Sequence, residues 1–299
     1  MAGTKIGRLQ IDTLTEIEHR FVEKAFLFGD LTHDDARRNQ DWLGSEFINQ
    51  ETLQLGMAFQ AFVIRTGKLN ILVDSCNGND KQRPTALWQH NLRSGAFMAN
   101  LNAMGLTPED IDIVLCTHLH CDHVGWNTRL VNGKWVPTFP NARYVMNRAE
   151  YDYFAAKYAT EDSLKVNNGA FEDSVLPVVE AGQSELVSDD HRVFHELGDE
   201  IILKSSPGHS LGHVCIHARS GQYEAVICGD VVHHPVQFDM PKLVMRADLD
   251  PVLASQTRQA LMEYCCETDA LLLAGHIPKM SIGRVKRHGS VYRLAAHNG

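Results

Sequence analysis

The chain has 299 residues, of which 28 are lysine or arginine and 37 are aspartate or glutamate, giving a formal net charge of −9. This acidic balance argues against general electrostatic attraction to nucleic acid or to anionic lipid. Hydrophobic residues make up 44% and charged residues 22% of the sequence, which is typical of a globular protein and excludes a coiled-coil rod. A chain of this length folds without help from a metal, so any bound metal is expected to serve chemistry.

Neither a signal peptide nor a transmembrane helix is expected, and we predict a cytoplasmic protein. Residues 1–14 contain no long apolar run after their basic residues, and no stretch reaches the roughly 18 apolar residues that span a bilayer. The seven cysteines are odd in number and show no framework spacing. Free thiols are therefore expected, as in a reducing compartment.

The first predicted element is a strand over residues 8–14, where polar and apolar residues alternate. Residues 16–28 fit either a continuing strand or the apolar stripe of a helix. Thr32 is predicted to cap a short helix that extends toward Trp42. The next predicted elements are a hairpin of strands 58–65 and 70–74, a helix over 94–104 that Gly105 ends, and a strand over 111–116.

Four apolar strands are each followed by a histidine or an aspartate. The strand over 111–116 precedes His118, and the later strands, 201–205, 225–228 and 270–274, precede His209, Asp230 and His276. Side chains that follow strands in this way are expected along one edge of a sheet, where ligand sites are common.

Two longer helices are predicted between these strands, over residues 147–158 and 251–268. The second has Leu253, Leu261, Met262 and Cys265 as its expected core face. Residues 160–190 are polar and are predicted to form a long surface excursion, either disordered or a functional lid.

The segment with the clearest chemistry is residues 117–123, which read Thr-His-Leu-His-Cys-Asp-His. His118, His120, Asp122 and His123 are four potential metal ligands, and imidazole and carboxylate are ligands that Zn²⁺ prefers. On an extended backbone His118 and His120 point the same way, so the other two turn toward a second position. A structural role would explain one histidine, but this density of ligands indicates two metal ions.

This motif, followed in order by His209, Asp230 and His276, resembles that of the metallo-β-lactamase superfamily. The resemblance covers nearly the whole chain. It implies an α+β fold, the αββα sandwich, in which two mixed sheets pack face to face with helices outside. The expected organisation is a single domain over residues 1–299 with an N-terminal extension over about 1–55.

The resemblance also implies how the ligands are shared between two zinc ions. The first ion takes His118, His120 and His209, the second takes Asp122, His123 and His276, and Asp230 bridges both. A hydroxide between the ions is then the nucleophile.

Several neighbouring residues have a functional and a structural interpretation. Asp122 and His233 are the predicted catalytic residues, since His233 stands where N-acyl homoserine lactonases have a tyrosine that faces the substrate. His233 or His234 donates to a leaving group, or both are structural histidines. His213 either orients a metal ligand or is a strand histidine with a backbone partner.

Asp74 is expected to support the metal loop, and Cys121 is expected to be a passive filler. For Trp126, Asn127 and Phe238 a core position is favoured over a place in the pocket lining.

The resemblance is best to compact dinuclear hydrolases, a group that includes lactonases and organophosphate-hydrolysing enzymes. Asp230 stands where true β-lactamases of this fold have no aspartate, and few residues follow His276, unlike in glyoxalase II. We therefore predict a zinc-dependent hydrolase of a small lactone or ester. The alternatives are a phosphotriester or aryl ester hydrolase, a mononuclear iron persulfide dioxygenase, and a non-catalytic sensing protein. Manganese, cobalt or iron in place of zinc, and a homodimer, are left open.

Overall fold

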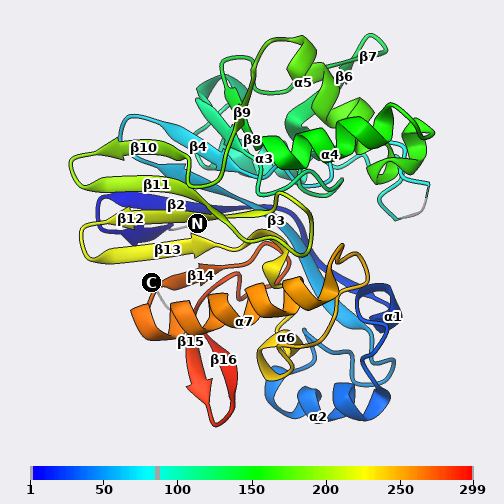
Figure 1. Cartoon of the computed structure of the whole chain (residues 1–299), viewed down its shortest axis with the longest axis vertical. Helices are drawn as coiled ribbons and strands as arrows, with labels where there is room; N and C mark the ends of the chain where they lie inside the picture. Colours follow the sequence, from blue (N-terminus) through cyan, green and yellow to red (C-terminus); the bar gives the residue numbers. More distant parts are fainter. Residues whose placement is uncertain (1–2, 85–87, 298–299) are drawn as a thin grey trace. The chain divides into compact units, whose positions relative to one another are not determined.

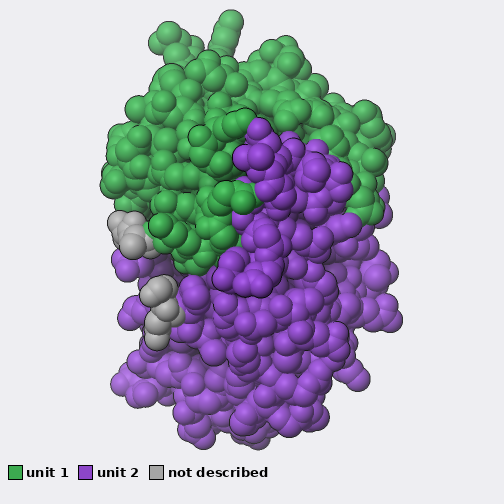
Figure 2. Space-filling model, turned by 90° about the vertical axis from the view of Figure 1, so that its left-hand side faces the viewer, with its two compact units in different colours: residues 1–16, 60–191 green, residues 17–59, 192–299 purple. Residues whose placement is uncertain are grey.

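The computed structural model describes residues 3–84 and 88–297, and the chain divides into two compact units. Unit 1 comprises residues 1–16 and 60–191, and unit 2 comprises residues 17–59 and 192–299 (Figure 2). The single domain over 1–299 stays a prediction, since each unit is described by itself. No helix in the described part of the chain is long and apolar enough to cross a bilayer.

The first sheet has seven strands in the order β1-β2-β3-β4-β5-β8-β9 (Figure 1). Their bounds are Thr4–Ile6, Leu9–Val22, Leu55–Arg65, Asn70–Val73, Ile113–Leu115, Arg143–Asn147 and Ser184–Val187. The pairs β4–β5, β5–β8 and β8–β9 are parallel, whereas β3 pairs with β4 in the antiparallel sense. The parallel register of β4 and β5 puts their carboxyl ends side by side, in unit 1.

The second sheet also has seven strands, in the order β10-β11-β12-β13-β14-β15-β16, and belongs to unit 2. Their bounds are Arg192–Glu196, Asp199–Ser205, Val214–Ser220, Tyr223–Ile227, Leu271–Leu273, Ile282–His288 and Val291–Ala296. Strands β13 and β14 are parallel, and every other neighbouring pair is antiparallel. Strands β11, β13 and β14 therefore all end at the same edge.

The α-helices are α1 (Lys24–Leu27), α2 (His33–Leu43), α3 (Ala96–Ala103), α4 (Arg148–Tyr158), α5 (Leu176–Glu180), α6 (Val236–Asp239) and α7 (Pro251–Thr268). A small hairpin, β6 (Thr128–Val131) and β7 (Lys134–Pro137), follows the short helix η2 (Gly125–Asn127). The other short helices are η1 (Pro108–Asp110), η3 (Ser163–Lys165), η4 (Asn167–Gly169), the π-helix η5 (Phe171–Val175) and η6 (Gly229–Val231).

Side chains cap the starts of three helices, and one of these caps, Thr32, was predicted from the sequence. Thr32 accepts a hydrogen bond from the backbone of Asp35, and Asn147 accepts one from Ala149. The carboxylate of Asp250 accepts from the first turn of α7, whose bounds are those predicted. These side chains satisfy amide groups that have no partner within the helix.

The structure decides one segment that was left open and corrects the prediction for another. Residues 16–22 continue strand β2, and the buried Glu16 of this strand accepts hydrogen bonds from Asn77 and Trp126 within unit 1. The stretch 160–190 is wrongly predicted as a surface excursion: it forms η3 to η5, α5 and β9. Phe171 and Val175 of this stretch join the hydrophobic core of unit 1.

On α7 the expected core face is largely confirmed. Leu261, Met262 and Cys265 are buried, whereas Leu253 is only half-buried. Arg258 is buried on the same helix, which the apolar pattern did not predict.

Candidate metal centre

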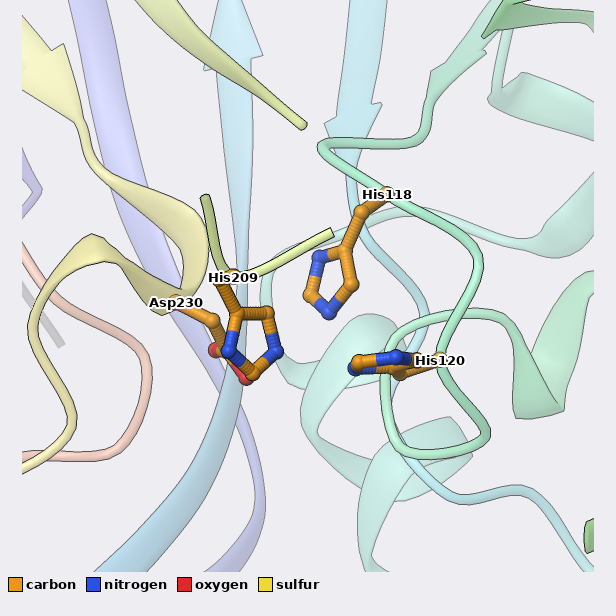
Figure 3. Close-up of side chains that lie close together, drawn as sticks. All are labelled: His118, His120, His209 and Asp230. Carbon is orange, nitrogen blue, oxygen red and sulfur yellow. The ribbon is translucent and has the colours of Figure 1, made fainter. Parts of the chain in front are cut away.

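Seven side chains are candidate metal ligands, and all seven were predicted from the sequence. Unit 1 supplies His118, His120, Asp122 and His123, and unit 2 supplies His209, Asp230 and His276. Figure 3 draws His118 and His120, from the loop after β5, and His209 and Asp230, from the loops after β11 and β13.

In unit 1, Asp74 fixes the loop that carries the ligands. It follows β4 directly and adopts a positive φ of 59°. Its Oδ1 accepts from the amide of Thr117 at 2.8 Å, and its Oδ2 accepts from the Thr117 hydroxyl at 2.8 Å. The same Oδ2 lies 2.9 Å from Nδ1 of His123. One carboxylate thus holds both ends of the ligand segment, which is the supporting role expected of it.

The histidine rings of this loop are close together and have defined orientations. The His118 ring lies 4.6 Å from that of His120 and 4.1 Å from that of His123, between centroids. Thr117 donates its hydroxyl hydrogen to Asp74, so its oxygen, 3.1 Å from Nδ1 of His118, accepts from that nitrogen. In His118 and His123 the nitrogen left for a metal is therefore Nε2.

The middle of the loop is held by neighbouring elements. The amide of Leu119 donates to the buried Glu150 at the start of α4, and the Leu119 carbonyl accepts from the side chain of Asn167. Cys121 is buried, and burial raises the pKa of its thiol to about 12. A thiol that stays protonated is a poor metal ligand, in agreement with the filler role.

In unit 2, Asp230 is the centre of the ligand group. Its Oδ2 lies 3.2 Å from Nε2 of His209, and its Oδ1 lies 3.0 Å from Nε2 of His276. The two oxygens of one carboxylate thus each face a different imidazole. This is the arrangement in which a carboxylate can serve two cations, one beside each oxygen.

Both imidazoles are oriented from behind. Nδ1 of His209 lies 2.9 Å from Oδ1 of Asp248, and Nδ1 of His276 lies 3.0 Å from the carbonyl oxygen of Ala58. Burial lowers the pKa of His209, but Asp230 and Asp248 raise it more, to about 9. Burial alone would raise the pKa of Asp248, yet His209 and the buried Arg258 hold it below its usual value. Asp248 therefore stays an anion that accepts the Nδ1 hydrogen of His209 and orients its ring.

His213 combines the two roles that the sequence left open. Its Nε2 accepts from the backbone amide of Asp230 at 3.0 Å, and its Nδ1 lies 2.8 Å from the hydroxyl of Ser206. It therefore bonds to backbone and, through that bond, positions Asp230.

His233 and His234 differ clearly. Nε2 of His234 lies 3.0 Å from the carbonyl of Phe47, and its Nδ1 accepts from the amide of Val236, which is a structural pattern. Burial lowers the pKa of His234 to about 4. His233 instead places Nε2 3.0 Å from Oδ2 of Asp230, while its buried Nδ1 has no hydrogen-bond partner among the described residues.

The aromatic and amide candidates are in the core, as favoured. Trp126, Asn127 and Phe238 are all buried. Two residues of the site were missed from the sequence: Asp248 and Arg258, which support His209. No spacing signal marks them, because Asp248 lies 39 residues from its histidine.

The donor set fits zinc. Four of the histidines have Nδ1 facing an oxygen, which leaves Nε2 as the ligand atom: His118, His123, His209 and His276. A carboxylate or carbonyl behind a ligating histidine is the usual support in zinc sites.

Comparison with known proteins identifies the family. The metallo-beta-lactamase superfamily matches residues 60–276 of the chain. The N-acyl homoserine lactonase AttM of Rhizobium radiobacter is 25% identical over 179 residues, 60% of this chain and 62% of that protein. The chain thus spans less than two thirds of the length of this relative.

Two solved structures share the fold. Hydrolase AbOPH of the beta lactamase superfamily has a TM-score of 0.79 at 24% identity, covering 100% of this chain and 99% of the other. AidC, a dizinc quorum-quenching lactonase solved with the product N-hexanoyl-L-homoserine, has a TM-score of 0.76 at 19% identity, covering 99% and 97%. These similarities confirm the predicted fold class, a mixed α+β fold of the metallo-β-lactamase type.

Proposed function

Because the chain belongs to the metallo-β-lactamase superfamily, we propose that it is a metal-dependent hydrolase that opens a lactone or a related small ester. The observation that carries this proposal is the pair of contacts at Asp230, whose two oxygens each face the Nε2 atom of a different, pre-oriented histidine.

The candidate ligands would hold two zinc ions. His118, His120 and His209 are the proposed ligands of the first ion, Asp122, His123 and His276 those of the second, and Asp230 would bind both. When bound, such ions supply Lewis acidity toward a carbonyl and a reactive nucleophile derived from water.

The remaining site residues have proposed roles that do not depend on the metal's identity. Asp74 and Asp248 keep the ligating imidazoles in one tautomer, so that Nε2 is available without rearrangement. His233, whose Nε2 bonds to Asp230, is the proposed donor to the substrate's leaving oxygen. Asp122 is proposed as a ligand that also contributes to catalysis.

The relatives favour a lactone over other esters. The curated relative is an N-acyl homoserine lactonase, and AidC is a lactonase solved with an opened lactone product. The sequence resemblance implies that His233 stands where such lactonases have a substrate-facing tyrosine. The proposed substrate class is therefore a small lactone, without a commitment to an acyl homoserine group.

A substrate panel on the zinc-loaded protein tests the proposal. The panel contains a γ-lactone, an N-acyl homoserine lactone, a nitrophenyl ester and a phosphotriester, and kcat/KM is measured for each. We expect a lactone to give the highest value and Asp230→Asn to abolish its turnover. A highest value for the phosphotriester or the aryl ester would replace the proposed substrate class, and no hydrolysis of any member would refute a hydrolase.

A further inference from the structure

Glu16 of strand β2 is a buried carboxylate that bonds to two loops beside the candidate ligands of unit 1. The residue is 4% exposed. Its Oε2 accepts from the backbone amide of Asn77 at 2.9 Å and from the Asn77 side chain at 2.7 Å. Its Oε1 accepts from the amide of Gly78 at 3.1 Å and from Nε1 of Trp126 at 2.7 Å. Four donors therefore converge on one carboxylate in the protein interior.

The chemistry of these partners selects the ionised form of Glu16. Each contact is made by an N–H group, and a carboxylate offers acceptors only, whereas an amide or a protonated carboxyl would turn a hydrogen toward an N–H. Burial raises the pKa of Glu16, and the four hydrogen bonds oppose that shift. Hydrogen bonds to a charged acceptor are stronger than neutral ones, so this carboxylate holds its partners firmly.

The first of the two loops, residues 74–78, is bonded directly to the backbone that carries the ligands. The amide of Ser75 donates to the carbonyl of the candidate ligand His123 at 2.7 Å, and the amide of Gly125 donates to the carbonyl of Cys76 at 2.8 Å. A shift of this loop would therefore move the backbone of His123 with it.

The two loops also touch backbone to backbone. A Cβ atom placed on Gly125 would lie 1.8 Å from the carbonyl oxygen of Asn77, so only glycine permits this approach. Glu16 bonds to Asn77 and Gly78 on one side of the contact and to Trp126 on the other. Its carboxylate thus clamps the two loops together.

A second route joins Glu16 to the ligand segment through side chains. The amide group of the buried Gln89 donates to Oδ1 of Asn77 at 2.8 Å. Oε1 of Gln89 lies 3.9 Å from Sγ of Cys121, which stands between the candidate ligands His120 and Asp122. In this chain each donor points toward the carboxylate, and such polarised chains strengthen their own hydrogen bonds.

We propose that Glu16 is a positioning residue for metal binding, whose carboxylate clamps residues 74–78 to residues 125–126 and thereby sets the position of His123. This inference rests on the proposed function, because the task that it assigns to Glu16 concerns the proposed zinc ions. Glu16 acts through Asn77, Gly78 and Trp126, and not by contact with an ion.

Glu16→Gln tests the clamp with a side chain of the same shape. Whichever way the new amide turns, its hydrogens face the donors of Asn77 or those of Gly78 and Trp126. We expect zinc affinity to fall by about 10-fold or more, measured on folded protein by competition with a chromogenic chelator. Zinc binding needs no substrate, so the result does not depend on which ester the protein hydrolyses.

Asp12→Asn is the matched control. Asp12 is a buried carboxylate of the same strand, and it pairs with Arg65 at 2.9 Å. This variant should lower the free energy of unfolding in urea and bind zinc as the native protein does. An equal loss of zinc affinity in Asp12→Asn and Glu16→Gln would overturn the proposal, because general destabilisation would then explain both.

Trp126→Phe is a gentler variant that decides the matter if Glu16→Gln does not fold. It keeps the ring that stacks on Phe97 and removes one of the four donors. We expect zinc affinity to fall about 3-fold. Native zinc affinity in folded Glu16→Gln or, if that variant does not fold, in Trp126→Phe would refute the role of Glu16. Failure of the native protein itself to bind zinc would instead refute the proposed metal centre.

Discussion

Each candidate ligand histidine with a resolved Nδ1 contact is oriented by an oxygen atom from its own unit. The four pairs are His118 with Thr117, His123 with Asp74, His209 with Asp248 and His276 with the carbonyl of Ala58. Orientation of this kind reduces the reorganisation that metal binding requires, and its loss typically costs 10- to 100-fold in metal affinity or activity.

Asp248→Asn tests this orientation at His209. The amide keeps the shape of the carboxylate but removes its charge, so His209 loses its fixed tautomer. We expect a roughly 10- to 100-fold weaker zinc affinity with an unchanged fold, measured by competition with a chromogenic chelator. The control is Glu267→Gln on the exposed side of α7, which should bind zinc as the native protein does. Native zinc affinity in Asp248→Asn would mean that the bond to His209 does not prepare the ligand.

His233→Ala tests the proposed proton donor. We expect zinc content to be retained, because His233 is not a proposed ligand, and kcat to fall by roughly 10²-fold. His234→Ala is the matched control: it removes hydrogen bonds to Phe47 and Val236 and should lower stability more than kcat. An unchanged kcat in His233→Ala would assign His233 a structural role.

At the scale of elements, the parallel strand pairs explain why the site could be largely predicted from the sequence. Apolar runs that end in Asp74, His118, Asp230 and His276 mark strands β4, β5, β13 and β14, and parallel pairing joins β4 to β5 and β13 to β14. Asp248 could not be predicted, because it comes from an irregular segment whose only signal is tertiary contact. Arg258 was missed because its charge is compensated by distant carbonyl oxygens, such as that of Leu243.

The segment 160–190 is a second case in which tertiary contacts decide the structure and the sequence pattern does not reveal them. Its polar composition predicted an excursion, but one buried ion cluster draws it into the core of unit 1. Asp173 of the π-helix η5 lies 2.7 Å from Arg83 and 3.5 Å from the ammonium of Lys81. Burial lowers the pKa of Lys81 to about 7, despite Asp173. Asn167, at the start of this folded stretch, in turn bonds to Leu119 of the metal loop.

Asp173→Asn tests this cluster. The substitution leaves the buried Lys81 and Arg83 without their counter-charge, which typically costs about 3–5 kcal/mol in the free energy of unfolding. Urea denaturation at neutral pH measures the loss. Glu185→Gln, which breaks the more exposed pair with Arg143, should cost no more than about 1 kcal/mol. Similar losses of unfolding free energy in both variants would show that the buried cluster stabilises the protein no more than the exposed ion pair does.

For the whole molecule, the superfamily match and the seven candidate ligands lead to the central claim that the protein binds two metal ions. Seven side chains among the described residues are candidate metal ligands. Seven ligands with a shared carboxylate suit two ions, whereas one ion needs about four.

Stepwise zinc titration of the metal-free protein tests this claim most directly, with bound zinc and lactone hydrolysis followed in the same samples. Two zinc ions per chain are expected to bind tightly, and activity should reach its plateau only as the second equivalent is added. Asp230→Asn, which weakens both positions, should fail to hold two ions at the same free zinc concentration. Full activity at one equivalent, with no second tight site, would contradict the dinuclear centre.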